Sequence, residues 1–128
     1  IVSIDPDGEI DWAKKIDKNQ ETINDNGFYS SYYMGLKDDQ LFLLFNDHEK
    51  NLDENRKNVK TFTARGGIAN LISINSIGDK NRYPIQYQAV NEPMIRPIIS
   101  RQIGDELFVV SVFRRDQRIG KINLNKKE

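Results

Sequence analysis

The stretch DDQLFLLF, residues 38–45, decides the fold class of this 128-residue chain. Two acidic residues suited to a turn precede five consecutive apolar residues, and a polar segment follows over 46–60. A short apolar run between turns is typical of a strand covered on both faces. The preceding segment FYSSYYMGL, 28–36, is aromatic and β-prone, so we expect the two segments to form a hairpin.

The rest of the chain also has the pattern of short strands joined by turns. The acidic turn DPDGE predicts a hairpin near the N-terminus, and residues 17–27 form a polar connector. Gly66 and Gly67 predict a bulge or a break within the strand expected at 61–74, and Pro84 predicts an edge or an irregular end in the strand expected at 82–90. Further strands are expected at 98–100, 107–113 and 119–124. With no long helix predicted, the fold class is all-β, built from antiparallel hairpins.

An internal repeat organises these hairpins. DDQLFLLF, 38–45, is matched by GDELFVVS, 104–111, and VSIDPDGEIDW, 2–12, is matched by ISINSIGDKNRY, 72–83. The offsets of 66 and about 70 predict related units over approximately 2–67 and 72–124. Four antiparallel strands per unit is the content of one β-propeller blade.

We therefore expect residues 1–128 to form a single all-β domain, or a fragment of a larger propeller, holding two to three propeller-like blades. An open β-sandwich is the alternative architecture. Propellers close with four to eight blades, so the exposed edges would need cover from a protein partner or from the rest of a longer parent chain.

Three runs carry a resemblance to known proteins: FYSSYYMGLKDDQLFLLFNDHEKNL, LISINSIGD and RPIISRQIGDELFVVSVFRRDQRIGKINL. They resemble the C-terminal part of uncharacterised propeller-like envelope proteins of Gram-negative bacteria. The shared features are an aromatic–Ser strand, a Phe/Tyr-Asn-Asp loop and a final Gly-Lys-Ile-x-Leu strand. The resemblance implies export, a periplasmic or cell-surface location and a longer parent chain, which fits a first residue that is Ile1. It implies no catalytic residues.

Composition weighs against several classes of function. The 19 basic and 19 acidic side chains balance, whereas nucleic-acid and anionic-membrane binders need a positive surface. The absence of cysteine excludes disulfides and thiolate chemistry. No apolar run approaches the length of a membrane span. Residues 1–60 nevertheless carry 13 acidic and 8 basic side chains, and 61–128 carry 6 and 11, a distribution that suggests solvated faces or a polar interface.

The loop FNDHEKNLDENRKN, residues 45–58, is the first candidate site. Its alternating oxygen-bearing side chains are candidate calcium ligands, although an EF-hand would need glycine at Leu52 and glutamate at Asn58. The alternative is a solvated loop with Asx turns, or a partner-facing loop through His48. The only histidine has no second histidine or cysteine with which to form a transition-metal site, so we expect no cofactor, with calcium as the alternative. The candidate calcium ligands are Asp47, Glu49, Asn51 and Asp53.

Two further groups are candidates for binding. On a strand, Tyr29 and Tyr33 would share one face, either as core residues or as an aromatic platform for a sugar or peptide. Arg114 and Arg115 lie in a predicted turn, either as a solvated tip or as a contact for an acidic partner. The predicted partner-binding residues are Tyr29, Tyr33, His48, Asn51, Arg114 and Arg115.

Known catalytic signatures are absent: the sequence has no nucleophile elbow, no phosphate-binding loop and no His-Glu-x-x-His. We therefore predict a non-catalytic interaction or scaffold module of a larger envelope protein or complex. A glycan- or calcium-binding module is the alternative, and a fragment of a hydrolase whose catalytic residues lie elsewhere is a distant third.

Overall fold

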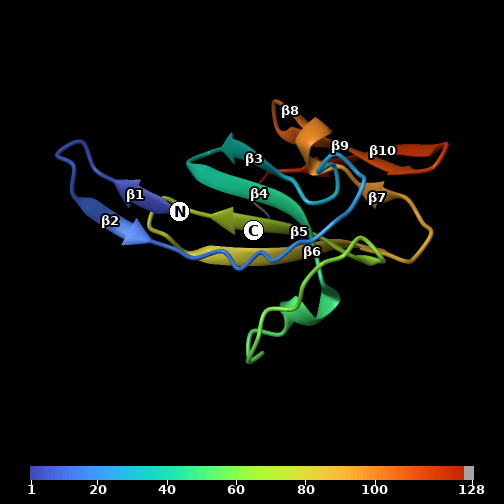
Figure 1. Ribbon diagram of the computed structural model, residues 1–128. Helices are drawn as coiled ribbons and strands as arrows, with labels where there is room; N and C mark the ends of the chain where they lie inside the picture. The colour runs from blue at the N-terminus through green and yellow to red at the C-terminus, as the bar shows by residue number, and fades with distance from the viewer. Residues whose placement is uncertain (126–128) are drawn as a thin grey trace.

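The computed structural model describes residues 1–125, which form three antiparallel sheets (Figure 1). The strands are β1 (Val2–Ile4), β2 (Ile10–Ala13), β3 (Tyr32–Lys37), β4 (Gln40–Asp47), β5 (Gly67–Ile74), β6 (Lys80–Gln88), β7 (Met94–Ile95), β8 (Arg101–Ile103), β9 (Glu106–Phe113) and β10 (Asp116–Asn123). Two 3-10 helices, η1 (Glu49–Leu52) and η2 (Pro97–Ile99), are the helical elements of these residues. The prediction of an all-β fold of antiparallel strands is confirmed. No helix in residues 1–125 has the length and apolarity to cross a membrane.

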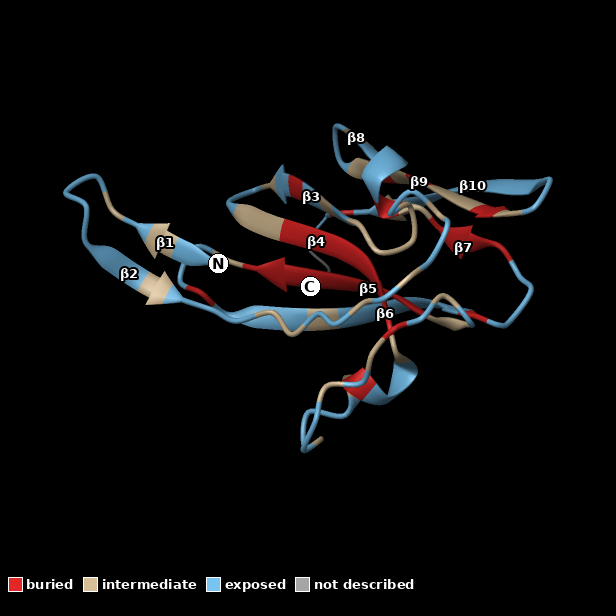
Figure 2. Cartoon of the chain, viewed as in Figure 1, coloured by how far each residue is buried: buried red, intermediate tan, exposed pale blue. Residues whose placement is uncertain are grey.

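The central sheet is a four-stranded meander in the order β3-β4-β5-β6. Its middle strands β4 and β5 are buried nearly throughout, as the red strands of Figure 2 show, because both of their faces are covered. This confirms the prediction that the apolar run at 41–45 forms a strand covered on both faces. The edge strand β6 is mostly exposed and holds Pro84 at a register shift opposite Ala69 and Asn70, as expected for proline in a sheet.

The second sheet has β9 at its centre, with β10 on one side and both β7 and β8 on the other. The prediction of a strand at 98–100 is wrong, because η2 occupies 97–99 and β8 begins at Arg101. Pro97 starts the 3-10 turn, where its fixed φ is suitable and its missing N–H costs no hydrogen bond. The amides of Ile99 and Ser100 then bond back to Arg96 and Pro97, so this segment does not pair with a strand.

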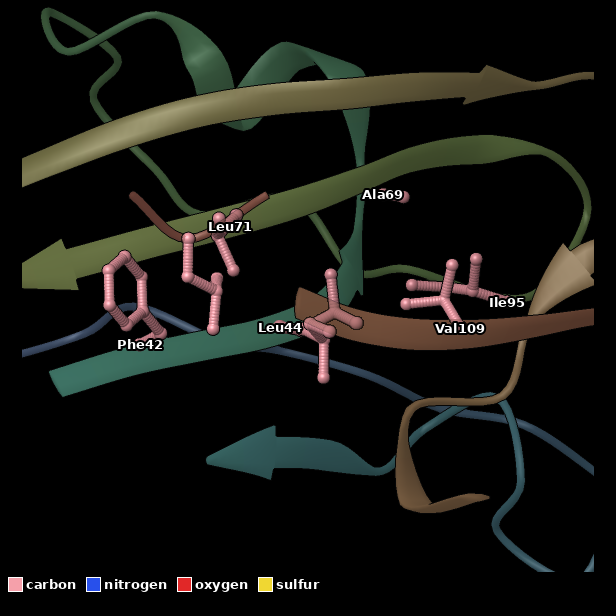
Figure 3. Close-up of a cluster of buried hydrophobic side chains, with 8 residues drawn as sticks. Phe42, Leu44, Ala69, Leu71, Ile95 and Val109 are labelled. Carbon is pink, nitrogen blue, oxygen red and sulfur yellow. The ribbon is translucent and has the colours of Figure 1, made fainter. Parts of the chain in front are cut away.

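The two larger sheets pack face to face around one apolar cluster (Figure 3). Alternate residues of β4 and β5 meet alternate residues of β9, because side chains along a strand point to opposite faces. The buried members of this cluster are Phe42, Leu44, Ala69, Leu71, Ile95, Leu107, Val109 and Leu124. The opposite face of the central sheet forms a second cluster, in which Trp12 and Ile16 from the N-terminal segment cover Phe45 and Ile72.

The N-terminal hairpin β1–β2 is held against the central sheet by Trp12. The indole Nε1 donates to the carbonyl of Ser76 at 3.0 Å, and the ring lies over Gly78. A Cβ atom at position 78 would approach the indole to 2.9 Å, and the φ of +89° also favours glycine there. The turn between β5 and β6 is therefore shaped to accept the preceding hairpin.

Two turns share one hydrogen-bond pattern at an offset of 70. Asp5 Oδ1 accepts from the amides two and four residues ahead, both at 2.9 Å, and Asn75 Oδ1 does the same at 3.1 and 2.9 Å. The amides of Gly8 and Gly78 donate to the carbonyls of these two residues, both at 3.0 Å. Residues 5–9 and 75–79 therefore form the same side-chain-capped turn.

Two hairpins likewise share one register at an offset of 66. Residues 35–37 pair with 40–42 across a two-residue turn, and residues 101–103 pair with 106–108 across another. The segment 28–36 does not form one continuous strand as predicted, because residues 28–30 lie in a turn and the strand begins only at Tyr32.

The Asp25 carboxylate fixes that turn before β3. It accepts hydrogen bonds from the amides of Gly27 at 2.9 Å and Tyr29 at 3.2 Å. Burial raises the pKa of Asp25, but hydrogen bonds from Thr22 and these amides outweigh it, so the pKa lies below its ordinary value. The charged carboxylate is therefore the form that holds the turn.

Candidate functional site

The candidate loop leaves the sheet at the buried end of β4. Asn46 and Asp47 lie in the covered centre of the sheet, and their exposed fractions are 0% and 1%. Buried polar groups must find partners inside the protein. The geometry of the loop follows from how these two side chains are satisfied.

The Asp47 carboxylate joins the loop to β5 and to the edge strand β6. Its Oδ1 accepts from the amide of His48 at 2.8 Å and from Asn51 Nδ2 at 2.7 Å. Its Oδ2 accepts from Asn70 Nδ2 at 3.5 Å and from Arg82 Nη1 at 3.2 Å. The pair with Arg82 is buried, with side-chain exposures of 10% for the arginine and 2% for the aspartate.

Asn51 closes the loop on itself. Its Oδ1 accepts from the amide of Lys60 at 2.7 Å, and its Nδ2 donates to the carbonyl of Lys60 at 2.8 Å. The side-chain amide of Asn51 therefore both donates to and accepts from the backbone of Lys60, as the backbone of a neighbouring strand would. His48 begins η1, and its Nδ1 accepts from the amide of Lys50 at 3.1 Å.

Asn46 connects the same end of β4 to the second sheet. Its Nδ2 donates to the carbonyls of Tyr29 at 3.1 Å and Ile95 at 2.9 Å. Its Oδ1 accepts from Gln88 Nε2 at 2.8 Å, and Gln88 Oε1 accepts from the amide of Ile95 at 2.7 Å. Gln20 Nε2 donates to the carbonyl of Asn46. This network positions β7 and the N-terminal connector around the loop base.

An open groove of about 410 Å³ lies beside the loop base. His48 and Glu49 line it together with Tyr87 and Val90, both of which are exposed. The floor includes Gly67, where a Cβ atom would lie 2.6 Å from the carbonyl oxygen of Asp47. The groove therefore combines an acid, an imidazole and an aromatic ring at one end of the central sheet.

The four candidate calcium ligands do not converge on one point. Asp47 and Asn51 are buried with protein donors on their oxygens. Glu49 is exposed, and Asp53 Oδ1 accepts from the amide of Asn55 at 2.9 Å. Within residues 1–125, no group of three His, Asp or Glu side chains has metal-site geometry. Calcium binding stays a prediction.

The two candidate tyrosines contact the second sheet. Tyr29 lies in the turn before β3, and its hydroxyl donates to the carbonyl of Val112 at 2.8 Å. Tyr33 lies on β3, and its hydroxyl accepts from the amide of Gln102 at 3.1 Å. The prediction that both lie on one strand face is wrong, because Asp25 holds Tyr29 in a turn. Both hydroxyls are used to join the sheets.

The candidate arginines lie apart from the loop. Arg114 and Arg115 form the exposed tip between β9 and β10, and the Arg114 guanidinium lies 5.1 Å from the centroid of the Phe113 ring. Sequence reasoning missed Arg96, whose guanidinium lies 4.6 Å from the ring of Phe28 and 5.4 Å from that of Tyr29. The arginine side chain thus anchors the turn before β3.

Sequence reasoning also missed Arg82, Gln88 and Gln20 as partners of the loop base. They lie 35, 42 and 26 residues away from their partners in the chain, so only the folded register brings them there. The register shift in β6 between Arg82 and Gln88 places them on opposite faces, so strand alternation in the sequence did not mark them as a pair.

Burial and the charge of Asp47 at the loop base both affect the pKa of Lys18. Burial lowers its pKa, and the negative charge of Asp47 opposes that shift. Its Nζ donates to the carbonyl of Ser30 at 3.0 Å.

No family model, curated protein or solved structure matches the chain.

Proposed function

We propose that the chain is a non-catalytic interaction module composed of successive units of a propeller-like repeat. The central sheet would be one complete unit, the second sheet the following unit, and β1–β2 the last hairpin of a preceding unit. The shared register at an offset of 66 and the shared turn at an offset of 70 support this assignment. Four-stranded antiparallel sheets stacked face to face are the architecture of a propeller.

The direction in which side chains point carries the proposal. Shifted by 66 residues, Leu107 and Val109 of β9 correspond to Leu41 and Leu43 of β4. Leu41 and Leu43 face the N-terminal hairpin, and Leu107 and Val109 face the central sheet. In both units, these positions therefore contact the part of the chain that comes before. A stack of equivalent blades requires this constant direction.

The alternate positions supply the complementary surface. Phe42 and Leu44 of β4 pack against the second sheet. Their counterparts Phe108 and Val110 of β9 point away from that cluster, because strand side chains alternate. The same outer face holds Ile119, which pairs with Val110 and is 76% exposed. The repeat thus leaves an apolar face where a following unit or partner would pack.

The other end of the stack is also apolar. Tyr32, Met34 and Leu36 lie on the β3 face that continues the second cluster, and their exposed fractions are 57%, 57% and 67%. Exposed apolar patches of this kind mark protein-binding surfaces. The mechanism we propose is surface complementarity at these two faces, within an envelope protein or complex as the sequence resemblance implies.

Polar contacts join the equivalent hairpins of the two units. Gln102 Oε1 accepts from the amide of Leu36 at 3.1 Å, and its Nε2 donates to the carbonyl of Leu36 at 2.8 Å. Gly35 leaves room for this amide, because a Cβ atom there would lie 2.7 Å from Gln102 Oε1. Lys37 Nζ and Asp105 Oδ1 pair at 2.6 Å between the two equivalent turns.

Analytical ultracentrifugation over a concentration series tests the proposal. The uncovered faces are expected to make the chain associate as its concentration rises. The double variant Met34→Glu, Leu36→Glu should stay monomeric with an unchanged far-ultraviolet circular dichroism spectrum. A folded wild-type chain that remains monomeric at every concentration contradicts the proposal.

The groove beside the loop supports glycan binding as a second candidate. Its exposed Tyr87 ring lies near Glu49 and His48, and an aromatic ring flanked by hydrogen-bonding groups suits a sugar. Glycan-array binding that is lost in Tyr87→Ala would support this second function. If neither the wild type nor Tyr87→Ala binds any glycan, this second function is rejected.

A further inference from the structure

The two larger sheets differ at one edge. In the central sheet the third strand, β5, pairs with β4 on one side and with β6 on the other. In the second sheet the corresponding strand, β10, pairs with β9 alone among the described residues. This correspondence rests on the proposed function, because it treats the sheets as units of one repeat. Residues along β10 are mostly exposed, in agreement with a free outer edge.

A cleft of about 460 Å³ lies next to that edge. Ile122 and Leu124 form its wall on the β10 side, and Tyr83 and Ile85 of β6 line the opposite side. Tyr83 pairs with Leu71 and so faces the main cluster, but it is 46% exposed. The apolar surface between the two sheets therefore continues past β10 without cover.

We propose that the outer edge of β10 accepts an extended polypeptide segment as a fourth strand. The segment would lie antiparallel to β10, as β6 lies antiparallel to β5. Its backbone would pair with the free amides and carbonyls of β10, and every second side chain would enter the cleft over Tyr83 and Ile85. The central sheet shows the geometry of such a four-stranded unit in this same chain.

The charges around β10 define the segment further. Arg114 and Arg115 are exposed at one end of the strand, whereas Arg118 and Lys121 along it pair with Asp116 and Glu106, both at 3.2 Å. Asp116 is the only acidic residue in β10 itself. The preferred segment is therefore apolar at alternate positions and acidic at the end that lies beside Arg114 and Arg115, since opposite charges across strands stabilise pairing.

A synthetic peptide tests the assignment. The probe has nine residues, with valine at alternate positions, threonine between them and glutamate at its C-terminal end, which an antiparallel pairing brings beside Arg114 and Arg115. Amide hydrogen exchange measured by NMR on the full chain should show new protection along β10 when the peptide is added, with β6 unchanged. The same peptide N-methylated on the edge that faces β10 cannot donate, so its binding should be weaker by at least about tenfold.

Variants separate this site from the stacking faces. Tyr83→Ser removes apolar surface from the cleft and should weaken peptide binding. Met34→Glu, Leu36→Glu blocks association of the sheet faces but should leave peptide binding unchanged, so the two proposals fail independently. Equal binding of the methylated and unmethylated peptides, or protection absent from β10, overturns the proposal and leaves β10 as a charge-protected edge only.

Discussion

Asp47 is the single residue on which most of the loop geometry depends. It lies at the end of a largely buried strand, and four protein donors surround its carboxylate. Such a buried carboxylate favours the native structure only while its partners are present, because an unpaired buried charge is strongly unfavourable. The sequence showed Asp47 as one of several loop oxygens and did not indicate that Arg82, far along the chain, would be its partner.

Asp47→Ala should lower the free energy of unfolding by about 3–5 kcal/mol, because it leaves the Arg82 guanidinium buried without its partner. Urea denaturation followed by tryptophan fluorescence measures the change. Glu54→Gln is the matched control, since Glu54 lies 3.6 Å from Arg82 Nε but is 67% exposed. Its effect should stay below about 1 kcal/mol. Equal losses in the two variants would show that the buried pair has no special role.

The stability of the fold at acidic pH should depend on Asp105. Its pKa is lowered by the hydrogen bond and charge of Lys37, and that of Lys37 is raised by Asp105. A carboxyl with a lowered folded-state pKa stabilises the fold above its ordinary value of about 3.9 and loses this effect as pH falls through the folded-state pKa. The lysine contribution is lost only at the alkaline end, as pH rises through its raised pKa.

Urea midpoints at pH 7, 4 and 3 therefore should decline more for the wild type than for Asp105→Asn, which has no carboxyl to protonate at this position. Parallel curves for the two proteins would contradict a role for this ion pair in acid stability. The magnitude is expected to be small because about half of the Asp105 side chain is accessible to solvent, which screens the pair.

At the scale of elements, local pattern predicted most of the strands and turns. The apolar run of β4, the glycine break before β5 and the capped turns at 5–9 and 75–79 were all readable, because each depends on neighbouring residues. The predictions that were wrong concern segments whose structure depends on a proline or on contacts between residues distant in the sequence. Pro97 turns a β-prone segment into η2, and Asp25 with Arg96 holds the start of FYSSYY in a turn.

The β3–β4 turn offers a stabilising change. Asp38 and Asp39 both have positive φ, +50° and +59°, as in the two-residue turns that favour Asn-Gly. Asp38→Asn, Asp39→Gly should raise stability by about 0.5–1 kcal/mol, because the left-handed backbone costs glycine less than aspartate. Differential scanning calorimetry measures the expected rise in Tm. A fall in Tm would show that these carboxylates make contacts that outweigh the backbone strain.

The contact between equivalent hairpins can be tested through Gly35. Gly35→Ala should lower the free energy of unfolding by about 1–3 kcal/mol, because its Cβ atom would displace Gln102 from the β3 backbone. Gly120→Ala is the matched strand control, since its Cβ atom would meet only Val109 at an ordinary 3.6 Å. If both variants unfold at the same urea concentration, the bridge from Gln102 contributes nothing measurable.

At the scale of the whole molecule, the N-terminal hairpin, the central sheet and the second sheet stack in chain order. The N-terminal hairpin covers one face of the central sheet, and the second sheet covers the other. The repeat in the sequence predicted related units but not their stacking, because the direction of side chains across a sheet depends on which face each neighbour covers. The apolar faces at both ends of the stack follow from that arrangement and not from composition.

The central claim is tested most directly by methyl and aromatic NOEs on the isotope-labelled chain in solution. The account predicts cross-peaks between Leu44 and Val109, which join the two larger sheets, and between the Trp12 indole and Gly78, which join the preceding hairpin to the central sheet. Strong NOEs within each sheet, together with the absence of both sets of cross-peaks between them, would contradict the stacked arrangement.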